Sequence, residues 1–230
     1  ETCSRLISRE VSDGIIARGF TPEALEILKS KKKGNYIILE GDFDYQYQDI
    51  EFREIMGFGL SQKANNCLLT LDDLSNLVTQ SEMGENWETN KKDLILATIT
   101  LKYTPSNSIS ISQGGIVIGV GAGQQNRVDC IKLSGAKSLV WRLRRHPKVL
   151  ELHTRFKEGI KRQDRTNAIT KYINGQFSDT ELVQWRDLFT EKVEMLSESE
   201  KNDFLVNSQG VCLSCHNSCA IAVTTISTVI

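Results

Sequence analysis

The stretch that most constrains the fold lies between residues 108 and 147, where two strand-like runs lead into a long helical pattern. The runs SISIS and GIVIGVG are separated by QGG, and paired glycines between short apolar runs are typical of a tight β-hairpin. After Gly123 the apolar residues recur with the period of a helix, and Pro147 ends that pattern. The residues on this predicted helical face are Val128, Ile131, Leu139, Val140 and Leu143.

The order strand, glycine loop, helix N-terminus predicts a place where an anion or a polarised carbonyl can bind. The first turn of a helix carries free backbone N–H groups and the positive end of the helix dipole. Arg127 adds a fixed charge there, and the glycines let a ligand approach the main chain. The run GVGAGQQNR nevertheless matches neither the nucleotide-hydrolase P-loop nor the complete dinucleotide fingerprint. A tight turn with a solvated arginine is the alternative interpretation.

The rest of the chain indicates an α/β protein. TPEALEILKSKKKGN reads as a helix with Thr21 as N-cap, Pro22 in the first position, lysines in the last turn and Gly34 at its end. YIILE reads as a buried strand. Residues 40–60 read as irregular and acidic. Helical spacing recurs in TLDDLSNLVTQ behind Thr70, in KKDLILATITLKYT and in TELVQWRDLF, and LSESEKNDFL reads as another capped helix start.

Charge and composition exclude several classes of partner. Lys plus Arg total 28 against 29 for Asp plus Glu, so a net charge of −1 offers no general attraction to nucleic acid or anionic lipid. No run of about 18 apolar residues predicts a membrane span, and no secretory leader is recognisable. Six scattered cysteines favour reduced thiols. We therefore expect a cytosolic globular protein that binds neither nucleic acid nor membrane.

The last twenty residues, VCLSCHNSCAIAVTTISTVI, differ in composition from the rest and carry no charged side chain. Cys212, Cys215, His216 and Cys219 place four soft ligands in eight residues, which raises a zinc hypothesis. No second Cys-x-x-Cys lies nearby and His216 adjoins Cys215, so a closed tetrahedron is awkward and we expect no metal site. A truncated copy, a gene-model error and a read-through of non-coding sequence are the alternatives for this tail.

Five runs together resemble one enzyme family. They are LISREVSDGIIARGFTPEALEILKSKKKGNY, DLILATITLKYTPSNSISIS, GIVIGVGAGQQNRVDCIKLSGAK, LRRHPKVL and FKEGIKR with TNAITKYI. They are similar to the AICAR transformylase domain of the bifunctional purine biosynthesis family, where AICAR is 5-aminoimidazole-4-carboxamide ribonucleotide. The resemblance divides the chain into a partial transformylase domain, residues 1–210, and a divergent tail, residues 211–230.

The resemblance implies a cytidine-deaminase-like α/β fold, here incomplete at both ends, and a homodimer with active sites near the subunit interface. It implies no zinc, and the chain lacks the zinc-deaminase signature H-x-E and P-C-x-x-C. The implied reaction moves a formyl group from the co-substrate 10-formyltetrahydrofolate to the 5-amino group of AICAR, without a prosthetic group. That amine is a poor nucleophile, so the reaction needs proton removal and close positioning.

By the same resemblance, Asp13 in REVSDG, Asn107 in TPSNS and Arg127 in GQQNR contact AICAR, and the backbone of Val128 contacts the folate. A carboxylate accepts from an amine or hydroxyl, an amide both donates and accepts, and a guanidinium suits an anionic nucleotide. We expect Asp13, Asn107 and Arg127 to face one cleft. The alternative roles are turn formation for Asp13 and Asn107, and a solvated surface charge for Arg127.

The resemblance also implies that the family's catalytic Lys-His pair falls upstream of residue 1 and that the cyclohydrolase domain is not part of this sequence. His146 and His153 are no substitutes, because RHPKVL predicts a helix-terminus role for His146. We therefore expect no catalytic residue in this chain, weak binding of AICAR or folate, and no turnover by the chain alone. The alternative function is an inactive fragment or a dimer partner of a full-length subunit.

Overall fold

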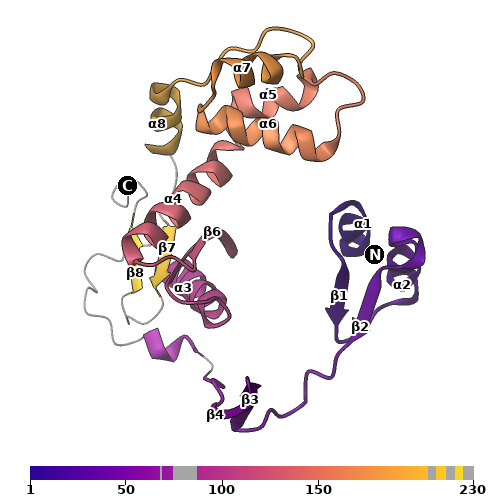
Figure 1. The fold of residues 1–230 in the computed structure, drawn as a ribbon, viewed down its shortest axis with the longest axis vertical. Coiled ribbons are helices and arrows are strands. Elements are labelled where there is room, and N and C mark those ends of the chain that lie inside the picture. The colour runs from indigo at the N-terminus through magenta and orange to yellow at the C-terminus, as the bar shows by residue number, and fades with distance from the viewer. Residues whose placement is uncertain (68, 75–86, 207–210, 216–220, 225–230) are drawn as a thin grey trace. The chain divides into compact units, whose positions relative to one another are not determined.

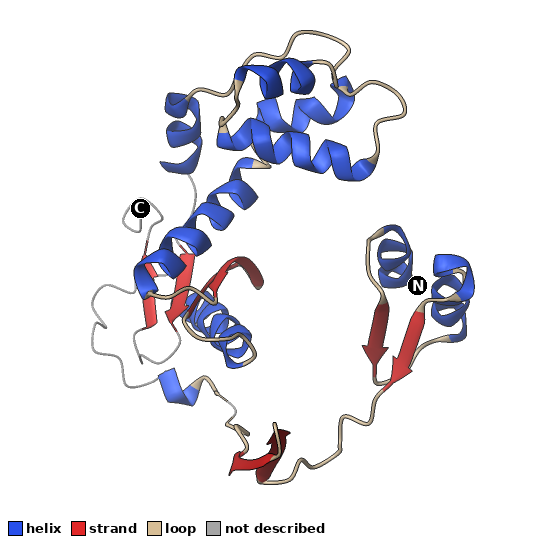
Figure 2. Cartoon of the chain, viewed as in Figure 1, coloured by secondary structure: helices blue, strands red, loops and turns tan. Residues whose placement is uncertain are grey.

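The computed structural model describes residues 1–67, 69–74, 87–206, 211–215 and 221–224. The chain divides into two compact units, Glu1–Cys67 and Leu68–Ile230, and each is described by itself. Figures 1 and 2 show that both units contain helices and strands. The α/β class predicted from the sequence is therefore confirmed.

The first unit contains a β-α-β arrangement preceded by helix α1 (Thr2–Arg9). Strands β1 (Gly14–Ala17) and β2 (Ile37–Glu40) pair in parallel, and helix α2 (Pro22–Lys29) connects them, as Figure 1 shows. The predicted N-cap is confirmed, because Thr21 Oγ1 accepts a hydrogen bond from the backbone N–H of Ala24 at 3.3 Å. The strand predicted in YIILE is β2, but the prediction that it is buried was wrong, because Ile37 and Leu39 are 57% and 53% exposed.

The predicted end of α2 was wrong. The α-helix ends at Lys29, and a 3-10 turn η1 (Lys31–Gly34) follows. Lys32 and Lys33 have φ angles of 51° and 55°, which lie in the left-handed region and interrupt the helical hydrogen-bond pattern. The lysines assigned to the last turn of a helix therefore form a separate turn.

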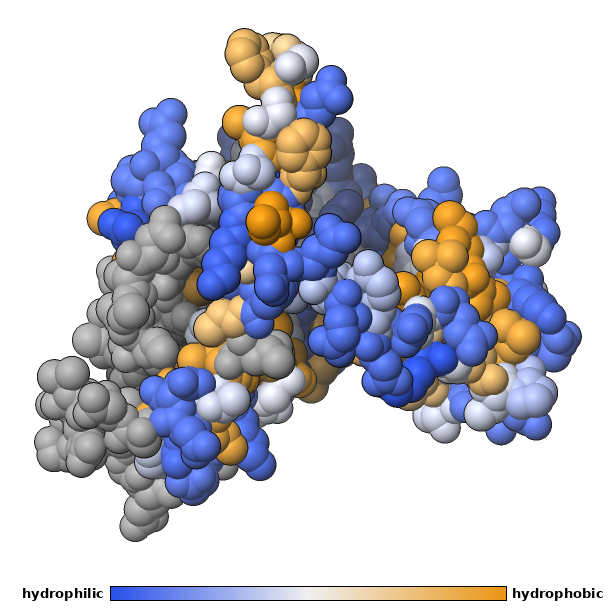
Figure 3. Space-filling model, turned by 90° about the horizontal axis from the view of Figure 1, so that it is seen from below, coloured by the Kyte–Doolittle hydropathy of each residue, from blue (hydrophilic) through white to orange (hydrophobic). Residues whose placement is uncertain are grey.

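The second half of residues 40–60 is also not irregular. Strands β3 (Ile50–Ile55) and β4 (Phe58–Lys63) form an antiparallel hairpin around Met56 and Gly57. Both turn residues have positive φ, 52° and 81°, as a two-residue hairpin turn of this hand requires. Acidic residues masked the strand pattern in the sequence. Apolar side chains of this hairpin, among them Phe52, Met56 and Phe58, are exposed. Figure 3 shows hydrophobic residues in orange on the face that it draws.

The second unit is built on an antiparallel sheet with the strand order β6-β5-β7-β8. Its strands are β5 (Ser108–Gln113), β6 (Ile116–Ala122), β7 (Val211–Cys215) and β8 (Ile221–Thr224). The predicted hairpin is confirmed as β5–β6, and its turn residues Gly114 and Gly115 have φ of 59° and 76°. The carboxylate of Asp93 accepts from both turn N–H groups at 2.7 Å. It thereby ties helix α3 (Trp87–Lys102) to the hairpin.

The helix predicted after Gly123 is confirmed as α4 (Arg127–Leu143), and it packs on this sheet. Ile109, Ile111, Ile118 and Cys130 form the buried cluster between them. Gly119 and Gly121 permit the close approach, since a Cβ atom on either would run into the carbonyl oxygen of Ser134 or Cys130. Val128 does not belong to the buried face, because it is 59% exposed.

The helices that follow α4 form a second core in the same unit. They are α5 (Pro147–Arg155), α6 (Arg162–Asn174), α7 (Asp179–Arg186) and α8 (Glu198–Val206). Tyr172 and Trp185 stack at the centre with ring centroids 5.6 Å apart, and Phe189 packs beside them. The predicted capped start of α8 is confirmed, because Ser197 Oγ accepts from the N–H of Glu200.

The helix predicted behind Thr70 is described only as far as the 3-10 turn η2 (Asp72–Leu74), and its remainder lies outside the described residues. Thr70 donates its N–H and hydroxyl to Asp73 at 2.7 and 2.8 Å, so Asp73 accepts the hydrogen bonds at this turn. Throughout the part of the chain that the structure describes, no helix is long and apolar enough to cross a membrane.

Candidate functional site

Asn107 lies at the end of the hairpin where β5 begins and β6 ends. The register pairs Ser108 with Ala122, so the residue before β5 and the loop after β6 meet at the same end of the sheet. Asn107 Nδ2 donates to the carbonyl oxygens of Gln124 and Gln125, each at 3.3 Å. Asn107 is therefore attached to the loop that leads to Arg127.

Side-chain hydrogen bonds of its own residues fix the first turn of α4. Asn126 is the N-cap, with its Oδ1 accepting from the N–H of Asp129 at 2.8 Å and its Nδ2 donating to the Asp129 carboxylate at 2.7 Å. The buried Cys130 donates its Sγ–H to the carbonyl oxygen of Asn107 at 3.0 Å. These contacts hold the start of α4 against the start of β5, and Arg127 is the first residue of that helix.

Arg127 is exposed, and no side chain in the described ranges pairs with it. Asp129, the one acidic residue of the first turn, is engaged by Asn126 instead. The two hydrogen bonds from Asn107 to the loop use its Nδ2, and its Oδ1 is an acceptor that they do not involve. The site therefore offers an uncompensated guanidinium, a positioned amide and the exposed Val128 at one helix N-terminus. This arrangement suits an anionic ligand with a hydrogen-bond donor.

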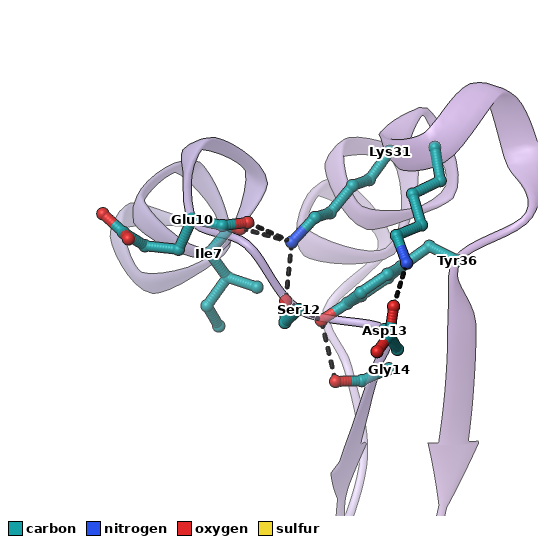
Figure 4. A network of polar contacts seen from close by, with 8 residues as sticks. Ile7, Glu10, Ser12, Asp13, Gly14, Lys31 and Tyr36 are labelled. Atoms are coloured by element: carbon teal, nitrogen blue, oxygen red, sulfur yellow. Dashed lines mark hydrogen bonds and ion pairs between the residues drawn. The ribbon is translucent and has the colours of Figure 1, made fainter. Parts of the chain in front are cut away.

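Asp13 belongs to the first unit and directly precedes β1. Its carbonyl oxygen accepts from the N–H of Ile37 at 3.2 Å, and its side chain is 92% exposed. Lys32 forms an ion pair with the Asp13 carboxylate (Figure 4). This hydrogen bond, together with the charge of Lys32, lowers the pKa of Asp13 below its ordinary value. The carboxylate is thus ionised at neutral pH and free on most of its surface.

Lys31 and Tyr36 form hydrogen bonds to the residues just before and just after Asp13 in the sequence (Figure 4). Lys31 Nζ donates to the carbonyl oxygens of Ile7 and Glu10 and to Ser12 Oγ. The buried Tyr36 donates its hydroxyl to the carbonyl oxygen of Gly14 at 2.9 Å. Neither role was predicted from the sequence, because Lys31 was assigned to a helix terminus and Tyr36 to a buried strand. The triple lysine before Gly34 was the available signal.

The structure thus brings Asn107 next to the loop before Arg127, with Val128 beside it. Asp13 lies in the other unit. A single cleft shared by Asp13, Asn107 and Arg127 stays a prediction.

Two cavities of the second unit lie away from the residues predicted to bind substrate. One of about 400 Å³ lies between β6, α4 and α6, where Ile118, Trp141, Arg144 and Thr170 line it. Another of about 270 Å³ is lined by Lys148, Tyr172 and neighbouring residues. None of the residues predicted to bind substrate lines either cavity. The candidate site therefore rests on the chemistry of the loop and not on enclosed volume.

His146 lies at a helix terminus, as predicted, but at the start of α5. It is the N-cap of that helix, and its Nδ1 accepts from the N–H of Lys148 at 3.2 Å. Burial lowers the pKa of His146. Its ring packs edge-on against Phe204, with the two ring centroids 5.0 Å apart. The Nδ1 atom of His146 is therefore used by the start of α5.

The described residues contain no group of three His, Cys, Asp or Glu side chains that could hold a metal ion. His216 and Cys219 lie outside the described residues, and so do the side chains of Cys212 and Cys215 on β7. The zinc hypothesis for the tail stays a hypothesis.

The two units and the strand–loop–helix junction define an α/β protein with a candidate anion site. The family model described as AICARFT/IMPCHase bienzyme matches residues 1–137, which is more than half of the 230 residues. The chain belongs to this AICARFT/IMPCHase family. Asp13, Asn107, Arg127 and Val128 all lie within the matched residues.

A curated relative agrees with the family assignment. The chain is 34% identical over 121 residues to the bifunctional purine biosynthesis protein PurH of Ruminiclostridium cellulolyticum. The matched part is 52% of this chain and 23% of the relative, so it spans about a quarter of that protein's length.

Proposed function

We propose that this chain serves the AICAR formyltransferase reaction of purine biosynthesis. The observation that carries the proposal is the attachment of Asn107 to the loop that ends at the exposed Arg127. The run from KYTPSNS to GQQNRVDC, which contains both residues, resembles the transformylase part of the family and not the cyclohydrolase part. This resemblance supports formyl transfer over ring closure.

In this proposal the residues bind and orient the substrates. Arg127 takes the anionic nucleotide, Asn107 Oδ1 accepts from the carboxamide, and Asp13 accepts from the amine or a hydroxyl. The backbone of Val128 contacts the folate. The amine nitrogen forms a bond to the formyl carbon, the bond from that carbon to N10 of the folate breaks, and the amine proton ends on N10. Orientation of the two reactants supplies much of the rate, and no described histidine is assigned as the base.

The proposal extends to the setting of the reaction. It includes a cytidine-deaminase-like fold, a homodimer, a cytosolic location and 10-formyltetrahydrofolate as co-substrate without a prosthetic group or metal. It includes no nucleic-acid or membrane partner. The near-balanced charge of the chain supports this last point.

The test uses the purified chain, AICAR and 10-formyltetrahydrofolate. Calorimetry measures AICAR binding, and tetrahydrofolate formation measures turnover. We expect Arg127→Ala to weaken AICAR binding about tenfold or more, because an ionic hydrogen bond to the nucleotide is lost. Lys132→Ala, an exposed lysine on the same helix, is the matched control and should change little.

Equal AICAR affinity in wild type and Arg127→Ala would refute the site. AICAR binding without tetrahydrofolate formation would instead favour the alternative, a subunit that binds substrate without turning it over. Measurable turnover that disappears in Arg127→Ala would assign transfer to this site.

A further inference from the structure

Lys31 is held in place by three hydrogen bonds, unlike an ordinary surface lysine. An ammonium group has three N–H donors, and all three are used here. They reach the carbonyl oxygen of Ile7 at 2.8 Å, the carbonyl oxygen of Glu10 at 2.7 Å and Ser12 Oγ at 2.6 Å. Lys31 therefore joins the end of α1 to the segment that enters β1.

Tyr36 completes this network from the other strand. The centroid of its ring lies 4.4 Å from Lys31 Nζ, a distance suited to cation–π attraction. Its hydroxyl donates to the carbonyl oxygen of Gly14 at 2.9 Å and lies 3.0 Å from Ser12 Oγ. Because residues 12 and 14 are both held, the main chain of Asp13 between them has little freedom (Figure 4).

We propose that Lys31 and Tyr36 are positioning residues that hold Asp13 in the orientation in which it accepts from the substrate. The proposal rests on the proposed function of Asp13. Lys31 also begins the left-handed turn from which Lys32 reaches the Asp13 carboxylate. Movement at Lys31 would thus displace both the carboxylate and its ionic partner. Lys31 and Tyr36 touch the substrate in no step, and they act through Asp13.

The first measurement is the titration of Asp13, followed by carboxyl-carbon NMR in the full chain. The charged groups that act on this carboxylate are Lys32 and, more weakly, Lys31, and both lower its pKa. Tyr36→Phe changes no charge, so a rise of the Asp13 pKa in this variant reports a looser Asp13–Lys32 contact. Lys31→Arg keeps the charge but loses the three-way ammonium geometry, and we expect a rise there too.

The second measurement is AICAR affinity by calorimetry. Misplacement of a positioned group by about 1 Å can cost up to about 100-fold. We expect Tyr36→Phe and Lys31→Arg to weaken binding at least fivefold. The matched control is Lys33→Met, which removes an exposed lysine from the same turn that pairs with no side chain in the described ranges.

If Tyr36→Phe and Lys31→Arg give the same Asp13 pKa and the same affinity as Lys33→Met, the positioning role is wrong. If wild type fails to bind AICAR, the proposed function fails. The NMR titration still decides whether Lys31 and Tyr36 orient Asp13 in that case, so the two failures are distinguishable. Thermal melting of every variant identifies one that fails to fold, and the milder Tyr36→Phe keeps the test available.

Discussion

The side-chain amide of Asn107 donates to the carbonyl oxygen of Gln124 across 17 residues of sequence, at 3.3 Å. This hydrogen bond joins the entrance of β5 to the exit of β6. It uses the Nδ2 donor of Asn107 and leaves Oδ1 out of this contact, so one side chain shapes the loop and, in the proposed function, also accepts from the ligand.

Asn107→Asp should weaken AICAR binding about tenfold or more. The carboxylate keeps the shape of the amide but has no N–H for the carbonyls of Gln124 and Gln125, and its charge opposes an anionic nucleotide. Calorimetry measures the affinity, and faster amide hydrogen exchange from residue 124 to residue 127 would report the loosened loop. Asn202→Asp adds the same charge at an exposed position of α8 and should leave both unchanged.

Gly121→Ala should lower the free energy of unfolding by about 1–3 kcal/mol. The added methyl would meet the carbonyl oxygen of Cys130 in the backbone of α4, so the helix must move away from the sheet. Urea unfolding measures the change. Gly19→Ala is the control, because its nearest neighbour is a flexible carboxylate oxygen at 3.6 Å. Equal stability of the two variants would show that α4 does not pack this closely in solution.

Asp93→Ala should destabilise the second unit by about 2 kcal/mol, since the buried carboxylate accepts from the N–H groups of Gly114 and Gly115. The turn glycines are exposed, so in the variant their N–H groups can donate to water instead, which limits the loss of stability. Asp93→Asn keeps one acceptor oxygen and should lie between wild type and Asp93→Ala in denaturant unfolding. Lys92→Ala, an exposed neighbour on α3, should have little effect, and a loss equal to that of Asp93→Ala would contradict the assignment.

The helical core should lose stability in acid through Glu200. Hydrogen bonds from Lys148 and from Ser197 lower the pKa of Glu200 from 4.5 to about 2. Because the folded-state pKa is depressed, this contribution is present above pH 4.5 and disappears as the pH falls towards 2. Thermal melts across that range should show a shallower pH dependence in Glu200→Gln. Glu191→Gln, an exposed carboxylate, should keep the slope of the wild type.

Local patterns determined much of this protein. The glycines of QGG predict the β5–β6 turn because positive φ at both positions favours glycine, and Thr21 and Ser197 predict helix starts because their hydroxyls satisfy free N–H groups. Asn107 was named only through the family resemblance, and its role in binding stays a prediction. The helix start beside Arg127 was predicted from the glycine loop that precedes it. Each of these features depends on residues only a few positions apart.

Tertiary structure decided the rest. The sequence cannot show that Lys31 reaches back to Ile7 and Glu10, because the hydrogen bonds form only after α1 and the turn have come together. The sequence gives no reason for glycine at positions 119 and 121. The reason is the backbone of α4, which packs so close to β6 that a Cβ atom would not fit. The acidic segment around β3 read as irregular, since its strand pattern depends on pairing with β4. The physical reason is common to all three: contacts between residues distant in sequence select one conformation among those that local propensity allows.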